Sequence, residues 1–330
     1  MKIVVDAYGG DNAPSEVVLG AVQAVRKDST LQVVLVGKED PLRAMLAEYD
    51  NPKQIEIVKA EDVIDCNESP TVAVRRKKDS SIVRMFEVLP DADGAVSAGS
   101  TGAVLAGGIF LCGRIRGVKR PALCPVLPTV KGGHVLLVDC GANTDCKPEY
   151  LVQFAEMGRA YMRCLFCNDS PRLGLLSNGA EDEKGNDLVK EAHALLAAAD
   201  LGLVRNVEAR EILSGDFDVI VSDGFNGNIA LKSAEGTAGA VFELLKEGIE
   251  GSFRAKLGAL LLKPVLKQIK KRMDYTEYGG AAFLGIRKPL VKVHGSAKAK
   301  TFCAAILQCA EMAKSKLVER LTEALKPEDE

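Results

Sequence analysis

The chain has 330 residues, with 43 Lys and Arg against 45 Asp and Glu, 47% hydrophobic residues and 27% charged residues. These fractions are those of an ordinary globular protein, and they exclude the disordered, collagen-like and low-complexity classes. A formal net charge of -2 argues against nucleic-acid binding over a large surface, which needs a strongly basic protein.

The cysteine pattern indicates a reducing compartment. The nine cysteines are an odd number scattered along the chain, and a disulfide framework is unusual in a protein of this length, so we expect a cytoplasmic protein. The apolar run after Met1 stops at Asp6 and is too short for a signal peptide. The longest uncharged run, residues 95–113, is rich in glycine and is typical of a buried strand, a turn and a packed helix rather than a membrane span.

Short β-branched segments alternate with helical patterns along the chain. Strands are predicted at residues 2–6, 31–36, 55–58, 95–97, 122–127, 135–139, 173–176, 219–222 and 290–293. Helices are predicted from Pro14 and at about 40–48, 79–89, 101–112, 148–163, 187–199, 227–249 and 298–316. This alternation indicates an α/β fold with a largely parallel sheet flanked by helices. The loops that follow the strands then meet at the carboxyl edge of the sheet, where ligands bind in such folds.

Two glycine-rich turns are candidates for anion binding. The first, residues 6–11, follows the first strand, and both phosphate contact and a merely tight turn are compatible with it. The second, residues 97–103, opens an apolar helix with hydroxyl and amide donors and no bulky side chain, as anion-binding loops require. A helix cap at Ser100 or Thr101 is the alternative, but one cap does not need four such residues. The candidates are Asp6, Gly9, Gly10, Asp11, Gly99, Ser100, Thr101 and Gly102.

Three further turns place amide and small residues at strand ends. They are residues 139–143 with Asn143, residues 176–179 with Asn178, and residues 223–228 with Gly227 and Asn228. Lys184 follows the second of these turns, where a lysine among amides can hold an oxyanion, although a solvated loop lysine is the alternative. Of the three histidines, only His294 follows a strand and precedes a helix. Together these turns predict one polar cleft.

The common cofactor motifs are missing from the sequence. The histidines do not have the spacing of a metal site, and no Walker, GxGxxG or GxSxG motif occurs. Cys164 and Cys167 have thioredoxin-like spacing but are a lone pair, which favours a buried structural role over redox or metal work. We therefore expect no metal, no nucleotide and no other cofactor.

Residues 252–273 combine basic and apolar side chains. No acidic residue lies between Glu250 and Asp274, and Pro264 suits the first turn of a second helix, so two short amphipathic helices are predicted. Such a segment fits a membrane surface or an acidic protein partner, and equally a packed helix pair with a solvated basic face. The candidate contact residues are Leu257, Leu260, Leu261, Leu262, Lys263, Lys267, Lys270 and Lys271.

Eight motifs in order resemble the phosphate acyltransferases that make acyl phosphate from acylated acyl carrier protein. They are DAYGGDNAP at 6–14, SAGSTGA at 97–103, DCGANTDC at 139–146, QFAEMG at 153–158, LSNGAEDEKG at 176–185, GFNGNIALKSAEG at 224–236, YGGAAFLG at 278–285 and HGS at 294–296. The resemblance extends over nearly the whole chain. Tyr8, Ser100 and Ala282 stand where the family usually has Met, Asn and Pro.

The resemblance implies a three-layer α/β/α sandwich similar to isocitrate dehydrogenase and phosphotransacetylase. It implies a single domain over residues 1–330 with a helical protrusion at about 250–274, a homodimer, and no metal or nucleotide. Inorganic phosphate would attack the thioester of acyl carrier protein directly, and a membrane glycerol-3-phosphate acyltransferase would use the acyl phosphate for phosphatidic acid and phospholipid synthesis. The family is cytoplasmic yet peripheral at the inner face of the membrane, which matches the amphipathic segment.

The chemistry of this reaction suggests roles for the candidate residues. The loop with Ser100 and Thr101 and the turn at residues 6–11 would bind phosphate, which needs placement and loss of water rather than a covalent intermediate. Lys184, Asn178 and Asn228 would donate to the oxyanion, and His294 would protonate the departing thiolate. The alternatives are a NAD- and metal-dependent dehydrogenase on the same fold and a non-enzymatic membrane scaffold.

Overall fold

The strands form two sheets rather than one. The computed structural model describes the backbone of residues 1–272 and 278–325, and the side chains of these residues except 270–272. The first sheet has the order β3 (Ile55–Lys59), β2 (Gln32–Gly37), β1 (Lys2–Asp6), β4 (Gly94–Ser97), β12 (Leu290–Lys292), β11 (Ala281–Leu284) and β5 (Ala122–Cys124). The second has the order β6 (Val126–Pro128), β7 (His134–Val138), β10 (Val219–Val221), β8 (Leu173–Ser177) and β9 (Leu203–Glu208).

Both sheets are mostly parallel, as predicted. In the first sheet, β3, β2, β1, β4 and β12 run parallel, and only β11 is antiparallel to its neighbours. In the second sheet, only the edge strand β6 is antiparallel. The chain passes from one sheet to the other at Pro125, between β5 and β6. Because proline has no N–H to donate, the strand predicted at residues 122–127 is divided there.

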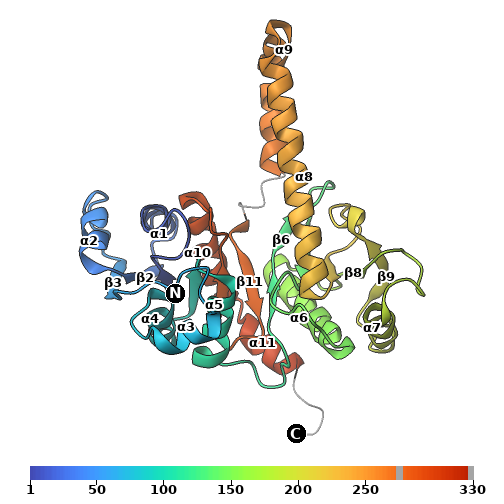
Figure 1. The fold of residues 1–330 in the computed structure, drawn as a ribbon, viewed down its shortest axis with the longest axis horizontal. Coiled ribbons are helices and arrows are strands. Elements are labelled where there is room, and N and C mark those ends of the chain that lie inside the picture. Colours follow the sequence, from blue (N-terminus) through green and yellow to red (C-terminus); the bar gives the residue numbers. More distant parts are fainter. Residues whose placement is uncertain (273–277, 326–330) are drawn as a thin grey trace.

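Helices cover both faces of the first sheet, which gives it three layers (Figure 1). Ile3 and Val5 pack against the helices α1 (Ser15–Lys27) and α10 (Ala299–Lys314). Val4 points to the opposite face, which is covered by the helices α3 (Pro70–Arg76), α4 (Ser81–Val88) and α5 (Thr101–Gly107). Strands buried on both faces have continuous apolar sequences, which is why residues 3–5 were predicted to form a strand. The short helices α2 (Glu39–Ala47), η1 (Leu89–Asp91) and η2 (Gly108–Cys112) complete this half.

The second sheet is layered in the same way. One face packs against α6 (Pro148–Phe166) and α7 (Asp187–Ala198), and α11 (Leu317–Ala324) packs on α6. Ala230 and Leu231 of α8 (Gly224–Glu250) pack on the other face, beside η3 (Ala209–Glu211). The three-layer α/β/α class is therefore confirmed, with two sheets in the place of one.

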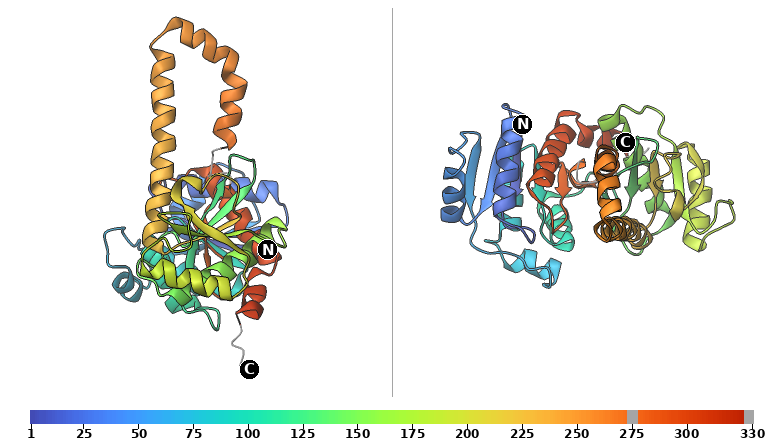
Figure 2. Two further views of the ribbon diagram at one scale, coloured as in Figure 1. Left: turned by 90° about the vertical axis from the view of Figure 1, so that its right-hand side faces the viewer. Right: turned by 90° about the horizontal axis from the view of Figure 1, so that it is seen from above.

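A helical hairpin projects from the body (Figures 1 and 2). It consists of α9 (Phe253–Arg272) together with the outer part of α8. The predicted pair of short helices at residues 252–273 is wrong, because α9 is one helix with Pro264 inside it. Pro264 is exposed, so water can bond the carbonyl that loses its helical donor. The protrusion is also longer than predicted, since a Cβ atom added at any of three glycines in α8 would meet no heavy atom within 4 Å: Gly236, Gly239 and Gly248.

Candidate active site

A cavity of about 460 Å³ lies where the loops of the two sheets meet. The first sheet contributes the loop after β4 and the end of β12, and the second contributes the loop after β7 and one side of α8. The lining includes polar or ionisable side chains and two glycines of the loops: Cys66, Gly99, Ser100, Thr101, Gly141, Asn228, Lys232, Glu235, Lys292 and His294. Apolar lining comes from Leu123, Val126, Leu127 and Leu231. Part of the polar cleft expected from the sequence therefore exists as one cavity.

Five of the predicted site residues line this cavity: Gly99, Ser100, Thr101, Asn228 and His294. Ser100 precedes α5, and its side chain makes no capping hydrogen bond to that helix, so within the described chain its hydroxyl is not used as a cap. Ser100 therefore occupies the N-cap position, as the helix-cap alternative has it, but its hydroxyl does not cap the helix. Asn228 faces this loop from the second sheet, where its amide lies beside Gly141.

Asp6 is buried beneath the cavity and does not line it. The Ser97 hydroxyl donates to Asp6 Oδ2 at 2.7 Å, and the Tyr8 N–H donates to Asp6 Oδ1 at 3.1 Å. Ser97 Oγ in turn accepts from the Gly99 N–H at 3.0 Å. Burial raises the pKa of the Asp6 carboxyl above its usual value of 3.8. Asp6 thus holds the loop in place, and the structure does not support the direct phosphate contact predicted for it.

The rest of the turn at residues 6–11 supports neighbouring loops. Gly10 has a φ of +97°, which favours glycine, and it lies against Ala98 and the Gly295 carbonyl. The Asp11 N–H donates to that same carbonyl at 2.8 Å. A side chain at Gly9 would meet the Gly99 N–H, and one at Gly102 would meet Pro70 of α3. Among the residues that the structure describes, the cavity lining includes none of these four predicted positions, Gly9, Gly10, Asp11 and Gly102.

Asp139 holds the second sheet's loop as Asp6 holds the first. Its carboxylate accepts from the N–H groups of Leu123 at 2.9 Å, Ala142 at 3.1 Å and Asn143 at 2.7 Å. The Asn143 side-chain amide also donates to Asp139 Oδ2, at 2.9 Å, and to the Pro121 carbonyl, at 2.7 Å. Burial raises the pKa of Asp139. Asn143 therefore stabilises the loop from behind and has no donor left for phosphate.

Gly227 lets α8 approach the end of β7. A Cβ atom at this position would lie 2.0 Å from the Asp139 carbonyl oxygen, a distance that two non-bonded atoms cannot adopt. Gly227 is buried, so its role is close packing rather than the substrate binding predicted for it. This contact places the next residue, Asn228, at the cavity.

Asn178 and Lys184 lie away from this cavity. Asn178 follows β8 and lines a different cavity, and Lys184 is exposed on the following loop, where its N–H donates to the Glu181 carbonyl at 3.1 Å. The structure does not bring either residue to Thr101 and Asn228 within one chain. Ligands bind at the carboxyl ends of parallel strands, and this rule selects the correct edge of the sheet. These two residues, however, lie on the other side of α8 from the cavity that contains Thr101 and Asn228.

Lys292 lines the cavity and was missed in the sequence. It is the last residue of β12, and the apolar strand Leu290–Lys292 contains no other charge. A lysine in a buried strand, two residues before His294, was the available signal, because residues two apart share a strand face. His294 Nδ1 accepts from the Ser296 N–H at 3.2 Å, so the neutral ring carries its proton on Nε2.

Known proteins match the chain over almost its full length. The family model described as "Fatty acid synthesis protein" matches residues 1–320. A phosphate acyltransferase of Geobacillus sp. (strain WCH70) is 47% identical over 98% of both chains, and one of Clostridium novyi (strain NT) is 47% identical over 97% of both. The chain belongs to the phosphate acyltransferase family. The predicted resemblance is confirmed, and the dehydrogenase and scaffold alternatives receive no support from these matches.

Solved structures outside the phosphate acyltransferases share the fold. A phosphotransacetylase from Streptococcus pyogenes superposes with a TM-score of 0.61 at 18% identity, covering 97% of this chain and 94% of that one. A branched-chain phosphotransacylase from Enterococcus faecalis V583 has a TM-score of 0.60 at 13% identity, covering 95% and 99%. These likenesses confirm the expected phosphotransacetylase-like architecture.

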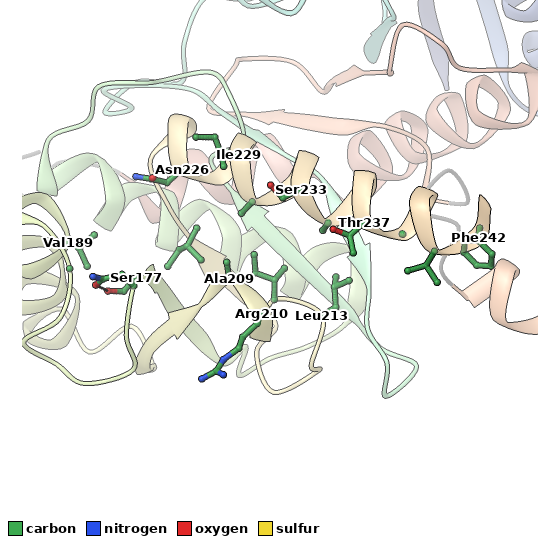
Figure 3. A pocket seen from close by; sticks show the side chains of 18 of the residues that line it. Ser177, Val189, Ala209, Arg210, Leu213, Asn226, Ile229, Ser233, Thr237 and Phe242 are labelled. Atoms are coloured by element: carbon green, nitrogen blue, oxygen red, sulfur yellow. Dashed lines mark hydrogen bonds between the residues drawn. The ribbon is translucent and has the colours of Figure 1, made fainter. Parts of the chain in front are cut away.

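A second, larger cavity of the phosphate acyltransferase lies on the opposite side of α8 (Figure 3). Its volume is about 1050 Å³. Ile229, Ser233, Thr237 and Phe242 of α8 border it on one side, and Leu213 lies across from them (Figure 3). Its lining is predominantly apolar and contains few groups that could act on an acyl thioester.

Residues 1–272 and 278–325 contain neither a metal-ligand cluster nor a membrane span. No group of three His, Cys, Asp or Glu side chains in these ranges is arranged to hold a metal ion. None of the helices in these ranges has the length and apolarity needed to cross a bilayer.

Proposed function

We propose that this phosphate acyltransferase transfers a fatty acyl group from acyl carrier protein to inorganic phosphate. The observation that carries the proposal is the meeting of Thr101, Asn228 and His294 in one cavity. A loop of hydroxyl and amide donors there faces an amide donor from the other sheet. Between them is room for a phosphate ion and a thioester.

The proposed reaction is a direct displacement. An oxygen of hydrogen phosphate attacks the acyl carbonyl carbon, the C–S bond breaks, and the proton of hydrogen phosphate ends on the carrier's thiol. Acyl phosphate and free carrier leave, and a membrane glycerol-3-phosphate acyltransferase takes the acyl phosphate toward phosphatidic acid. The chain's task is placement, because two reactants held in the correct orientation react far faster than in solution.

Individual residues have distinct roles in this proposal. Ser100 and Thr101 donate to phosphate oxygens, and the Asn228 amide donates to the oxygen that becomes negative during attack. The His294 Nε2–H donates a hydrogen bond to the departing sulfur, since Nδ1 is already occupied by Ser296, and the proton that ends on the thiol is the one that hydrogen phosphate loses. The acyl chain lies along the apolar lining that includes Val126 and Leu231. No metal or nucleotide takes part.

Reconstitution with acylated carrier protein tests the proposal. Free thiol and acyl phosphate, trapped with hydroxylamine, should appear in equal amounts and only when phosphate is present. Sulfate in place of phosphate is the control. Thiol release that does not depend on phosphate would contradict the proposal.

Two matched variants test the oxyanion donor. Asn228→Ala should lower kcat on the order of 100- to 1000-fold, because one such donor contributes roughly 3–4 kcal/mol. Asn178→Ala removes the same group from a position outside the cavity. If the two variants lose equal activity, the oxyanion is not held where we propose.

We also infer that the hairpin of α8 and α9 contacts the cytoplasmic face of the membrane. Leu257, Leu260, Leu261 and Leu262 are 55%, 63%, 78% and 54% exposed. Lys263 and Lys267 are exposed beside them, and the side chains of Lys270 and Lys271 lie outside the described residues. Exposed leucines framed by lysines suit the interface of a bilayer with anionic lipids.

Vesicle sedimentation tests this contact. Replacing Leu260, Leu261 and Leu262 by Asp should abolish binding to vesicles that contain anionic lipid. Val130→Asp, at a position 70% exposed on the body, is the control for a new surface charge. Unchanged sedimentation of the triple variant would show that the leucines are structural or face the carrier protein.

A homodimer is the expected assembly. Val241 and Leu244 of α8 are 57% and 68% exposed, and Val241 borders the larger apolar cavity. A second copy covering this face would remove exposed apolar area from water. Light scattering should therefore report a dimer, and Leu244→Asp should weaken it. A wild-type monomer at micromolar concentration would contradict this inference.

A further inference from the structure

Lys292 is fixed beside the hydroxyl-bearing loop by the pairing of two strands. In the parallel register of β12 with β4, Lys292 is the partner of Ser97. The Val293 N–H donates to the Ser97 carbonyl at 2.9 Å, which continues the pairing past the strand end. Lys292 therefore lies next to the residues that begin the loop, and it lines the cavity together with Ser100 and Thr101.

The amine of Lys292 has donor capacity left for a ligand. Lys292 Nζ donates to the Ala98 carbonyl at 3.4 Å and to the Val293 carbonyl. An ammonium group has three N–H donors, so one remains. Backbone carbonyls carry no net charge, and among the described residues Lys292 forms no ion pair with a carboxylate. A half-buried cation with no carboxylate in direct contact is stabilised by an anion that enters the cavity.

Several titratable side chains lie near the Lys292 amine. Asp6, Asp11 and Cys66 act electrostatically on Lys292, and the other titratable groups that line the same cavity are Lys232, Glu235 and His294. Burial is the largest influence and lowers the pKa of Lys292 to about 8, while Cys66, Asp6 and Asp11 act in the opposite direction. At pH 7 most molecules therefore carry the charge, and above pH 8 most lose it.

We propose that Lys292 is the cation that binds the phosphate nucleophile and directs one of its oxygens toward the acyl carbonyl. This inference rests on the proposed function and deepens it. A single lysine acts as a point charge on one side of the phosphate, so it can hold the ion while the oxygens on the other side stay free to attack. The charged role that the sequence suggested for Lys184 thus passes to Lys292, because Lys292 lines the cavity and Lys184 does not.

Steady-state kinetics of two matched lysine variants test the proposal. Lys292→Met should raise the KM for phosphate roughly 10–100-fold, the equivalent of losing one charge-assisted hydrogen bond. Lys288→Met is the control, because Lys288 Nζ also donates to backbone carbonyls, those of Ala92 at 2.7 Å and Pro90 at 3.5 Å, before β12 begins. An unchanged KM in folded Lys292→Met would overturn the proposal.

The pH profile gives a readout that a merely structural lysine would not change. For the wild type, kcat/KM for phosphate should fall as the pH rises through about 8, the pKa of Lys292 in the free protein. Lys292→Arg keeps its charge over this range, so the fall should disappear. The same fall in the Arg variant would refute the role, and this variant also serves if Lys292→Met does not fold.

Calorimetry with inorganic phosphate separates this inference from the proposed function. If the wild type binds phosphate and Lys292→Met binds it at least about tenfold more weakly, Lys292 is the phosphate ligand even if acylated carrier protein proves not to be the acyl donor. Equal binding by both proteins would exclude Lys292 whatever the acyl donor is.

Discussion

Two glycines in the same helix provide a direct test of the site's construction. In Gly227→Ala, the new Cβ would lie 2.0 Å from the Asp139 carbonyl oxygen and 3.1 Å from its carbon. Non-bonded atoms are most stable at about 3.5–4.0 Å, so α8 and the end of β7 must separate by roughly 1.5 Å. In Gly236→Ala, further along α8, the new atom has no neighbour within 4 Å.

The expected energies of the two variants have opposite signs. Alanine favours an exposed helix interior over glycine by about 0.5–1 kcal/mol, so Gly236→Ala should leave the protein equally or slightly more stable. In Gly227→Ala, overpacking costs about 1–3 kcal/mol, which offsets the helical gain and leaves a net loss of up to about 2.5 kcal/mol. Asn228 moves with the helix, and a displacement of about 1 Å can lower turnover on the order of 100-fold.

Urea unfolding and acyl phosphate formation measure both effects on the same samples. We expect Gly227→Ala to lose stability and turnover together, and Gly236→Ala to keep both. If Gly227→Ala matches Gly236→Ala in stability and rate, then α8 does not rest on the end of β7, and Asn228 is not positioned by this contact.

Three further outcomes are expected. Asp139→Asn replaces an acceptor by a donor beneath the loop, so buried N–H groups lose their partner at about 1–3 kcal/mol each, and urea unfolding should show a loss of this order. Thr101→Val removes a hydroxyl without changing shape, so the KM for phosphate should rise roughly 2–10-fold in the steady-state assay, and an unchanged KM would remove Thr101 from the phosphate site. The pKa of Asp6 is raised in the folded protein, so its contribution to stability is fully present below pH 3.8, the usual value, and is lost as the pH rises through the higher folded-state value. Asp6→Asn should therefore become more stable relative to the wild type as the pH increases from about 3.5 to about 7. If the difference between their free energies of unfolding in urea stays constant across this range, the burial of a charged carboxylate is contradicted.

Local patterns in the sequence were sufficient for most of the elements. The predicted strand at residues 2–6 is β1, and the predicted helix at 187–199 is α7 within one residue. Elements with weaker patterns were missed, among them α3, β9 and β11. At Pro264 the local rule predicted a helix start, but the exposed α9 continues through it because water can satisfy the carbonyl. Solvent exposure, rather than local preference, decided the case of Pro264.

The candidate site was predicted as a set of loops rather than as a set of side chains. Polar turns at strand ends correctly indicated Ser100, Thr101 and Asn228. The same turns contain Asp6 and Asn143, which face inward and hold the loops through hydrogen bonds. A glycine-rich turn has the same composition whether its donors face a ligand or a buried carboxylate, so composition does not separate the two.

By itself, the sequence determined the α/β alternation, the polar loops at the strand ends and the membership of the phosphate acyltransferase family. Only the tertiary structure decided that there are two sheets, that Lys184 lies outside the cavity and that Lys292 lies inside it. The physical reason is the range of the interactions. Helix and strand patterns depend on neighbours a few residues away, whereas the contact of Lys292 with Ala98 joins positions 194 residues apart through the register of β12 on β4.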